Sequence, residues 1–159
     1  MTGLMQTLRL VHILSGAVLF GTGAGIAFFM LMADRTKSAR TVADVARIVV
    51  IADFVFTASA VVVQPISGAA LAWHLGFSLK EGWIALSIAL YLVAGAFWLP
   101  VVWMQMRMRD LSAEAAAKGA PLPALYHRFF WWWFAFGLPA FAAVLGIFWL
   151  MIAKPEIRW

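Results

Sequence analysis

The sequence predicts an all-α protein, an antiparallel bundle of four membrane-spanning helices, because it contains four long stretches that are almost free of charge. Residues 10–33, 82–106 and 129–153 contain no Asp, Glu, Lys or Arg, and residues 48–79 contain one such residue, Asp53. A helix needs about 20 apolar residues to cross a bilayer, and it satisfies its own backbone polar groups there. Apolar residues make up 65% of the chain, above the roughly 45–50% of soluble domains.

The four spans leave no room for a second domain. The longest segment between the uncharged stretches, Arg107–Arg128, is too short to form a soluble core. The absence of cysteine excludes disulfides, thiolate metal sites and cysteine nucleophiles. We therefore expect a single transmembrane domain over residues 1–159, with spans at about 8–33, 44–75, 82–108 and 125–153.

The first two spans carry different local signals. The first is rich in small residues, and Gly21 and Gly25 form a GxxxG motif that predicts the close approach of another helix. We expect this span to be retained, because it lacks a cleavage signal. In the second span, the pattern from Thr41 to Asp44 predicts a helix start, and Pro65 predicts a kink.

The last two spans are separated by strong helix-stopping signals. The third span contains Pro100 and is expected to continue as a polar helix to Lys118, where Gly119 and two prolines end it. The fourth is expected to begin near Ala124. Tryptophan favours the membrane interface. The residues expected to form interfacial belts are Trp73, Trp83, Trp131, Trp132, Trp133 and Trp149.

Basic residues are distributed unevenly between the two sides of the predicted bundle. Four lie on the side of the termini and eight on the other side, which we call the basic end. The eight are Arg35, Lys37, Arg40, Arg47, Arg107, Arg109, Lys118 and Arg128. The positive-inside rule predicts that the basic end is cytoplasmic and that both termini face outward. We attribute the net charge of +5 to orientation and contact with anionic lipids, not to nucleic acid.

His12 is the sharpest candidate for chemistry, because polar residues inside a membrane usually serve a pathway, a pairing or a cofactor. A neutral imidazole is a good ligand for haem iron, and Arg9, one turn earlier, could pair with a propionate. The alternative is a histidine that is hydrogen-bonded between helices. His74 lies on the same side and is a candidate second ligand, whereas His127 lies on the opposite side and cannot share the site.

Asp53 is the only acidic residue inside a span, and it shares a helical face with Thr57 and Gln64. This polar face either fixes the register of the helices or forms part of a proton route. We expect Arg47 or Arg128 to pair with Asp53, because an unpaired carboxylate at this depth is unfavourable.

Several runs together resemble a known family. The chain resembles a bacterial family of "predicted integral membrane" proteins with four spans and unknown function, over essentially all 159 residues. With the outward orientation of the termini, the resemblance implies a bacterial inner membrane protein whose termini are both periplasmic. The runs are residues 53–57 (DFVFT), 64–68 (QPISG), 98–105 (WLPVVWMQ), 126–128 (YHR) and 147–155 (IFWLMIAKP).

The run from Arg9 to His12, followed by small residues, is more distantly similar to the first span of HemJ-type protoporphyrinogen oxidases and CopD-like copper-resistance proteins. HemJ-type proteins are four-helix membrane proteins associated with haem b. The resemblance implies haem b, with His12 as the axial iron ligand and Arg9 near a propionate. The region of Gly68 and Trp83 corresponds more loosely. No histidine follows Trp83 in the third span, so His74, another ligand and five-coordinate iron are open alternatives.

Three classes of function follow from these observations. The first is a haem b protein with a redox or electron-transfer role, in which Tyr91 or Trp83 lines the pocket. The second is an accessory, assembly or transport protein without a cofactor. The third is an enzyme that acts on a porphyrin or a quinone. The corresponding partners are the lipid bilayer and a quinone, a porphyrin or a redox partner protein. The sequence leaves the oligomeric state open.

Overall fold

The computed structural model describes residues 2–157, and every regular element within them is helical. Four helices are long and apolar enough to cross a membrane, which confirms the all-α prediction. The second of these consists of three consecutive elements, α2, η1 and α3, of which η1 is a π-helical turn. The elements are α1 (Thr2–Arg35), α2 (Ala39–Ala52), η1 (Asp53–Thr57), α3 (Ala58–Leu75), α4 (Gly82–Ala117) and α5 (Ala124–Ala153).

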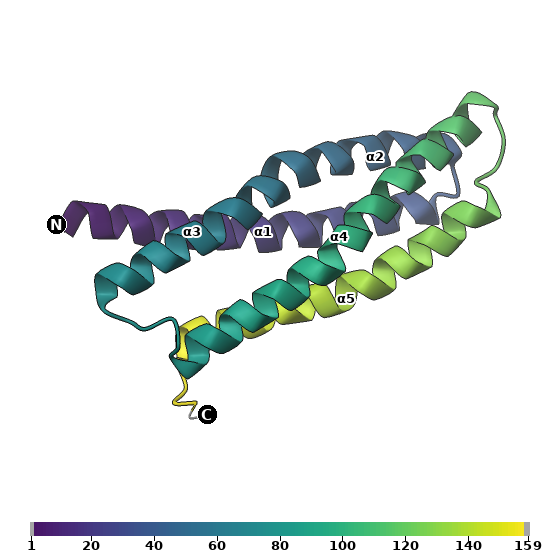
Figure 1. Cartoon of the computed structure of the whole chain (residues 1–159). Helices are drawn as coiled ribbons and strands as arrows, with labels where there is room; N and C mark the ends of the chain where they lie inside the picture. Colours follow the sequence, from purple (N-terminus) through teal and green to yellow (C-terminus); the bar gives the residue numbers. More distant parts are fainter. Residues whose placement is uncertain (1, 158–159) are drawn as a thin grey trace.

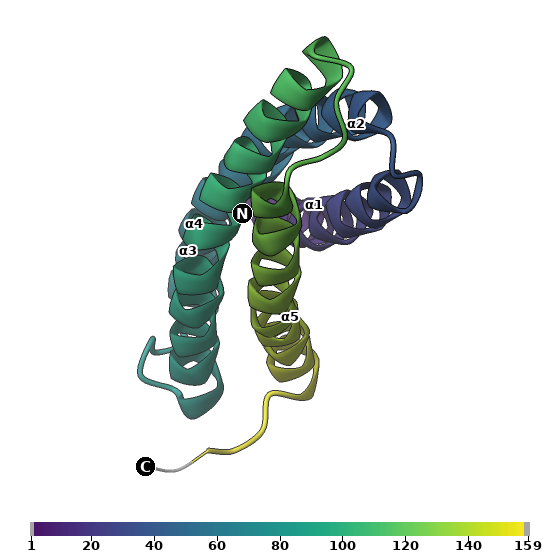
Figure 2. The same ribbon diagram turned by 90° about the vertical axis from the view of Figure 1, so that its right-hand side faces the viewer.

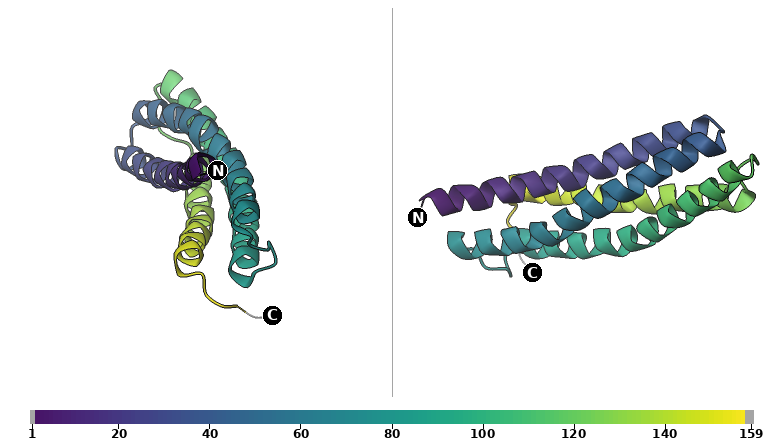
Figure 3. Two further views of the ribbon diagram at one scale, coloured as in Figure 1. Left: turned by 90° about the vertical axis from the view of Figure 1, so that its left-hand side faces the viewer. Right: turned by 90° about the horizontal axis from the view of Figure 1, so that it is seen from above.

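The helices form two antiparallel hairpins (Figure 1). In one, α1 packs against α2, η1 and α3; in the other, α4 packs against α5. The hairpins meet mainly where α2 lies on α4, which Figure 2 shows from the basic end. Toward the opposite end, which we call the terminal end, the two pairs diverge (Figure 1). Figure 3 shows the N-terminus and the connection between α3 and α4 together at the terminal end.

The connections at the basic end follow from local capping chemistry. The Ser38 side chain accepts a hydrogen bond from the Thr41 backbone N–H at 3.2 Å, so α2 begins at Ala39. Our prediction of a start at Thr41–Asp44 placed this boundary too late, because Ser38 is the cap. Between α4 and α5, Gly119 takes a left-handed conformation (φ 61°), as expected for a glycine that ends a helix.

The second membrane-crossing helix passes through Pro65 without interruption. Proline has no N–H to donate to the carbonyl four residues earlier, which is that of Val61. The Tyr91 hydroxyl of α4 donates a hydrogen bond to this carbonyl instead. The π-helical turn lies upstream of Pro65, at Asp53–Thr57, where the sequence analysis predicted regular helix.

The tightly packed core lies in the half of the bundle near the basic end. There α1, α2, α4 and α5 bury their apolar side chains together, and Met30, Met108 and Tyr126 have no exposed surface. Trp133 is also buried in this core, so the prediction that it belongs to an interfacial belt was wrong. The GxxxG prediction also differs from the structure: no other helix lies within 4 Å of a Cβ placed on Gly21 or Gly25.

Candidate functional site

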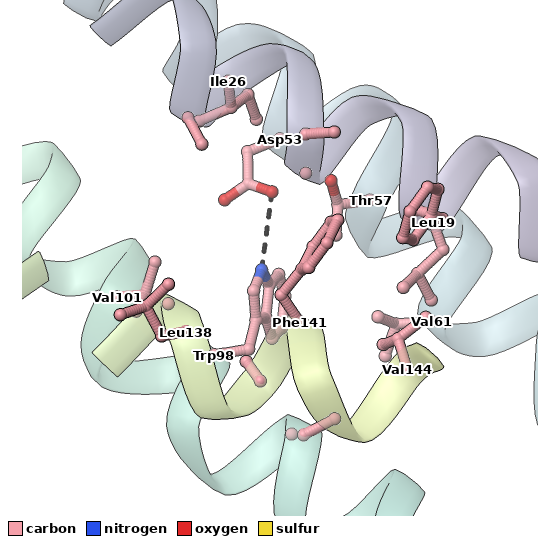
Figure 4. Close-up of a pocket in the computed structure, with 18 of the residues that line it drawn as sticks. Leu19, Ile26, Asp53, Thr57, Val61, Trp98, Val101, Leu138, Phe141 and Val144 are labelled. Carbon is pink, nitrogen blue, oxygen red and sulfur yellow. Dashed lines mark hydrogen bonds between the residues drawn. The ribbon is translucent and has the colours of Figure 1, made fainter. Parts of the chain in front are cut away.

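A cavity of about 460 Å³ lies between the two hairpins, next to the buried core. All the membrane-crossing helices contribute to its wall, which is mostly apolar (Figure 4). On α1 the lining runs from Gly16 to Ala27, which corresponds to about 16 Å along the helix axis. The polar or amphipathic residues in the wall are Asp53, Thr57, Gln64, Tyr91, Trp98, Gln105 and Trp133.

Glycines on three helices help to create this space. Gly23 of α1, Gly95 of α4 and Gly137 of α5 all line the cavity. A Cβ added to any of them would meet no atom within 4 Å. Since close packing is normal in protein interiors, three glycines with open space in front of them leave room for a further molecule.

Asp53 projects into the cavity from the π-helical turn (Figure 4). Its exposed fraction is 4%, and its Oδ1 accepts a hydrogen bond from Trp98 Nε1 at 3.4 Å. The expectation that Arg47 or Arg128 pairs with Asp53 was wrong, since neither forms an ion pair with it in the described chain. A π-turn inside an α-helix is rare and frequently occurs at functional sites.

Two buried polar atoms in the cavity wall form no well-aligned hydrogen bond with the described residues. They are the Thr57 hydroxyl and the Gln105 amide nitrogen. The other end of the Gln105 amide is satisfied, because its Oε1 accepts a hydrogen bond from Trp133 Nε1 at 3.1 Å. Buried polar groups are nearly always paired with protein, water or a ligand. The cavity therefore presents one carboxyl group and an unpaired amide nitrogen in an otherwise mostly apolar wall.

His12 belongs to a hydrogen-bonded chain between α1 and α3. The Ser15 hydroxyl donates to Gln64 Oε1, and Gln64 Nε2 lies 3.4 Å from His12 Nε2. His12 Nδ1 lies 3.0 Å from the Ser67 hydroxyl, which itself donates to the Val63 carbonyl at 2.7 Å. This order makes His12 Nδ1 the donor to Ser67 and leaves Nε2 as the acceptor from Gln64. Coordination of iron by either nitrogen would require one of these contacts to open.

The three described histidines lie apart from one another, and none of them lines the cavity. His12 packs against Gly68, whereas His74 lies six residues further along α3, about 9 Å by helix geometry. His74 is exposed, and its Nδ1 donates to the Ala70 carbonyl at 2.9 Å. His127 is at the basic end, with its Nδ1 3.9 Å from Asp34 Oδ1. The two imidazoles predicted as iron ligands are thus at different levels of the bundle.

The remaining residues predicted to bind haem are also distributed over several places. Arg9 is exposed near the start of α1. Trp83 is at the terminal end, where its Nε1 donates to Glu81 at 3.1 Å. Tyr91 lines the cavity. Within residues 2–157, no group of three His, Asp or Glu side chains is arranged to hold a metal ion.

Comparison with known proteins now adds the family. The family model described as "Predicted integral membrane protein (DUF2269)" matches residues 6–155, almost the whole chain. The chain belongs to this family. No curated protein matches the chain significantly, and no solved structure does. Membership of DUF2269 establishes a multi-pass integral membrane protein, and the more distant resemblance to HemJ-type and CopD-like proteins finds no support in these comparisons.

The sequence analysis missed two residues that contact the polar part of the site, Trp98 and Trp133. Trp133 was assigned to an interfacial belt, and Trp98 was noted only within the run that carries the family resemblance. Their indole N–H groups instead donate to Asp53 and Gln105 inside the bundle. Trp98 lies well inside the third uncharged stretch, too deep for the interface. This position was the signal in the sequence that its indole N–H has a partner inside the bundle.

Proposed function

We propose that this protein binds a lipid-soluble molecule inside the membrane, with the apolar body of the ligand in the cavity and a hydrogen-bonding head group against Asp53. The observation that carries the proposal is the combination of an apolar cavity of about 460 Å³ with a buried carboxyl group at its wall. Pockets for small molecules typically measure about 300–1,000 Å³ and combine apolar walls with a few polar groups.

The polar groups restrict the chemistry of the head group. A carboxylate at Asp53 accepts a hydrogen bond, and the unpaired amide nitrogen of Gln105 donates one. A ligand hydroxyl can pair with either of these groups, because it both donates and accepts. We therefore propose a quinol, or another apolar molecule with a ring hydroxyl, as the ligand class. Such a molecule reaches the site from the lipid, without passing through water.

This proposal falls within the class of accessory, transport or redox-carrier binding proteins, and it needs no metal. Haem binding at His12 stays a prediction, because its imidazole nitrogens contact Gln64 and Ser67 and its ring does not line the cavity. We also propose that the basic end faces the cytoplasm of a bacterial inner membrane, on the basis of the eight-to-four distribution of basic residues.

A matched pair of substitutions on one helix tests the proposal. Gly23→Leu fills the cavity, whereas Gly21→Leu, two residues earlier, adds the same side chain on an exposed face; neither site has an atom within 4 Å of the added Cβ. The measurement is the thermal unfolding of detergent-purified protein with and without a short-chain benzoquinol. Ligand at 100 times its Kd stabilises the folded state by about 2.7 kcal/mol.

We expect the benzoquinol to raise the Tm of the wild type and of Gly21→Leu, and to leave the Tm of Gly23→Leu unchanged. An equal rise in all three proteins would place the binding outside the cavity. No rise in the wild type would contradict the quinol as ligand class.

A further inference from the structure

A second groove lies on the outside of the α4–α5 hairpin, near the basic end. Its volume is about 400 Å³, and it shares no lining residue with the central cavity. Its lining includes Pro100, Trp103 and Met104 of α4 and Arg128, Phe129 and Trp132 of α5. Trp103 and Trp132 are 52% and 53% exposed, so the groove opens toward the surrounding lipid. We call it the aromatic groove.

Aromatic contacts give this groove a defined wall. The rings of Trp103 and Phe129 meet edge to face, with centroids 5.4 Å apart. Trp132 meets Phe136 in the same way, with centroids 6.0 Å apart. These contacts hold flat, apolar surfaces on either side of the α4–α5 seam.

Arg128 is the one charged residue in the lining, and it is located in the part of α5 nearest the basic end. It forms no hydrogen bond or ion pair with any residue that the structure describes. From Arg128 to Phe136, the groove extends about 12 Å along the helix. The hydrocarbon layer of one leaflet is about 15 Å thick. The groove therefore joins an unpaired cation at headgroup level to apolar walls at the depth of acyl chains.

We propose that the aromatic groove binds an anionic phospholipid, with one acyl chain between the aromatic side chains and the phosphate on the Arg128 guanidinium. A guanidinium forms strong paired hydrogen bonds with phosphate oxygens. A zwitterionic headgroup would add its own cation near Arg128, whereas an anionic headgroup adds none. The basic end carries eight basic residues against four acidic ones, which favours the same sign of ligand.

A second copy of the chain fits this groove less well. In a two-fold symmetric dimer the same patch meets itself, so the two Arg128 side chains would approach each other without an acidic partner. A phospholipid supplies both the apolar chain and the negative charge that this surface lacks.

The test uses native mass spectrometry of the full-length protein in detergent, with phosphatidylglycerol or phosphatidylcholine of identical acyl chains. Arg128→Gln removes the proposed contact, and Arg40→Gln is the matched control. Arg40 is an exposed arginine of α2 that also forms no ion pair in the described chain. Both variants change the net charge equally, and a micelle provides no charged bilayer surface.

We expect the wild type and Arg40→Gln to retain phosphatidylglycerol in preference to phosphatidylcholine. In Arg128→Gln the preference should fall about five-fold or more, the change that corresponds to about 1 kcal/mol for one basic residue, and Arg128→Lys should retain part of it. Inorganic phosphate should not displace the lipid, because the groove also binds the acyl chain. Equal retention of both lipids by the wild type would overturn the proposal, as would equal losses in Arg128→Gln and Arg40→Gln. A lipid-free dimer would assign the groove to a second copy.

Discussion

Replacing Gly68 by alanine perturbs a close contact between α1 and α3. A Cβ on Gly68 would lie 3.0 Å from His12 Cε1, closer than ordinary van der Waals contact. The added methyl group must push the imidazole away by a few tenths of an ångström. This displacement changes the geometry of the His12 contacts with Gln64 and Ser67.

The expected cost follows from these contacts. Overpacking of a close-packed interior costs about 1–3 kcal/mol, and each interhelical hydrogen bond in a membrane contributes about 0.6 kcal/mol. The higher helix propensity of alanine offsets up to about 1 kcal/mol. We therefore expect Gly68→Ala to lower the free energy of unfolding by about 1–3 kcal/mol. Gly21→Ala, where the Cβ meets nothing within 4 Å, should be neutral or slightly stabilising.

A double-mutant cycle identifies the partner of the added methyl group. The measurement is the unfolding of purified protein by a denaturing detergent, for the wild type, Gly68→Ala, His12→Ala and the double variant. In the His12→Ala background the imidazole is absent, so the cost of Gly68→Ala should fall by more than about 0.5 kcal/mol, the largest deviation from additivity expected for sites that do not interact. If Gly68→Ala costs the same in both backgrounds, the contact with His12 does not account for the glycine, and the reasoning is refuted.

Three further predictions test other parts of the account. Tyr91→Phe should lower the free energy of unfolding by about 1 kcal/mol, because the Val61 carbonyl loses its donor. The same substitution should cost less in a Pro65→Ala background, because alanine restores the helical N–H that pairs with this carbonyl. Equal costs in the two backgrounds would refute the reasoning. If haem is bound as predicted, the visible spectrum of protein from haem-replete cells shows a Soret band that His12→Ala abolishes or shifts, and a colourless preparation would contradict haem binding. Reporter fusions at Lys37 should report the cytoplasm and fusions at the C-terminus the periplasm; the reverse pattern would overturn the orientation.

The fold was predictable because membrane-spanning helices are long, uncharged and separated by strong stop signals. The end of α4, for example, follows from Gly119 and the prolines behind it. The start of α2 was placed too late because two hydroxyl residues, Ser38 and Thr41, compete for the cap position. Such a choice depends on backbone geometry that the sequence pattern does not contain.

The candidate site was predictable only in part. Asp53, Thr57 and Gln64 were grouped on one face from their spacing, and all three line the cavity. Their partners on α4 and α5 were not predictable, because the faces of a membrane helix that contact lipid are as apolar as those that contact protein. Hydrophobic periodicity therefore does not indicate which side of Trp98 or Trp133 faces inward. The π-turn at Asp53 also lacks a recognised sequence signal.

The measurement that tests the central claim most directly is the identification of lipid-soluble molecules that copurify with the protein from its native membranes. Protein isolated in a mild detergent is extracted with organic solvent, and the extract is quantified by mass spectrometry relative to protein. We predict one apolar, hydroxyl-bearing species at close to one equivalent in the wild type and in Gly21→Leu, and its loss from Gly23→Leu. The same extract from all three proteins, or no enriched species in the wild type, would contradict the assignment of the cavity as a binding site.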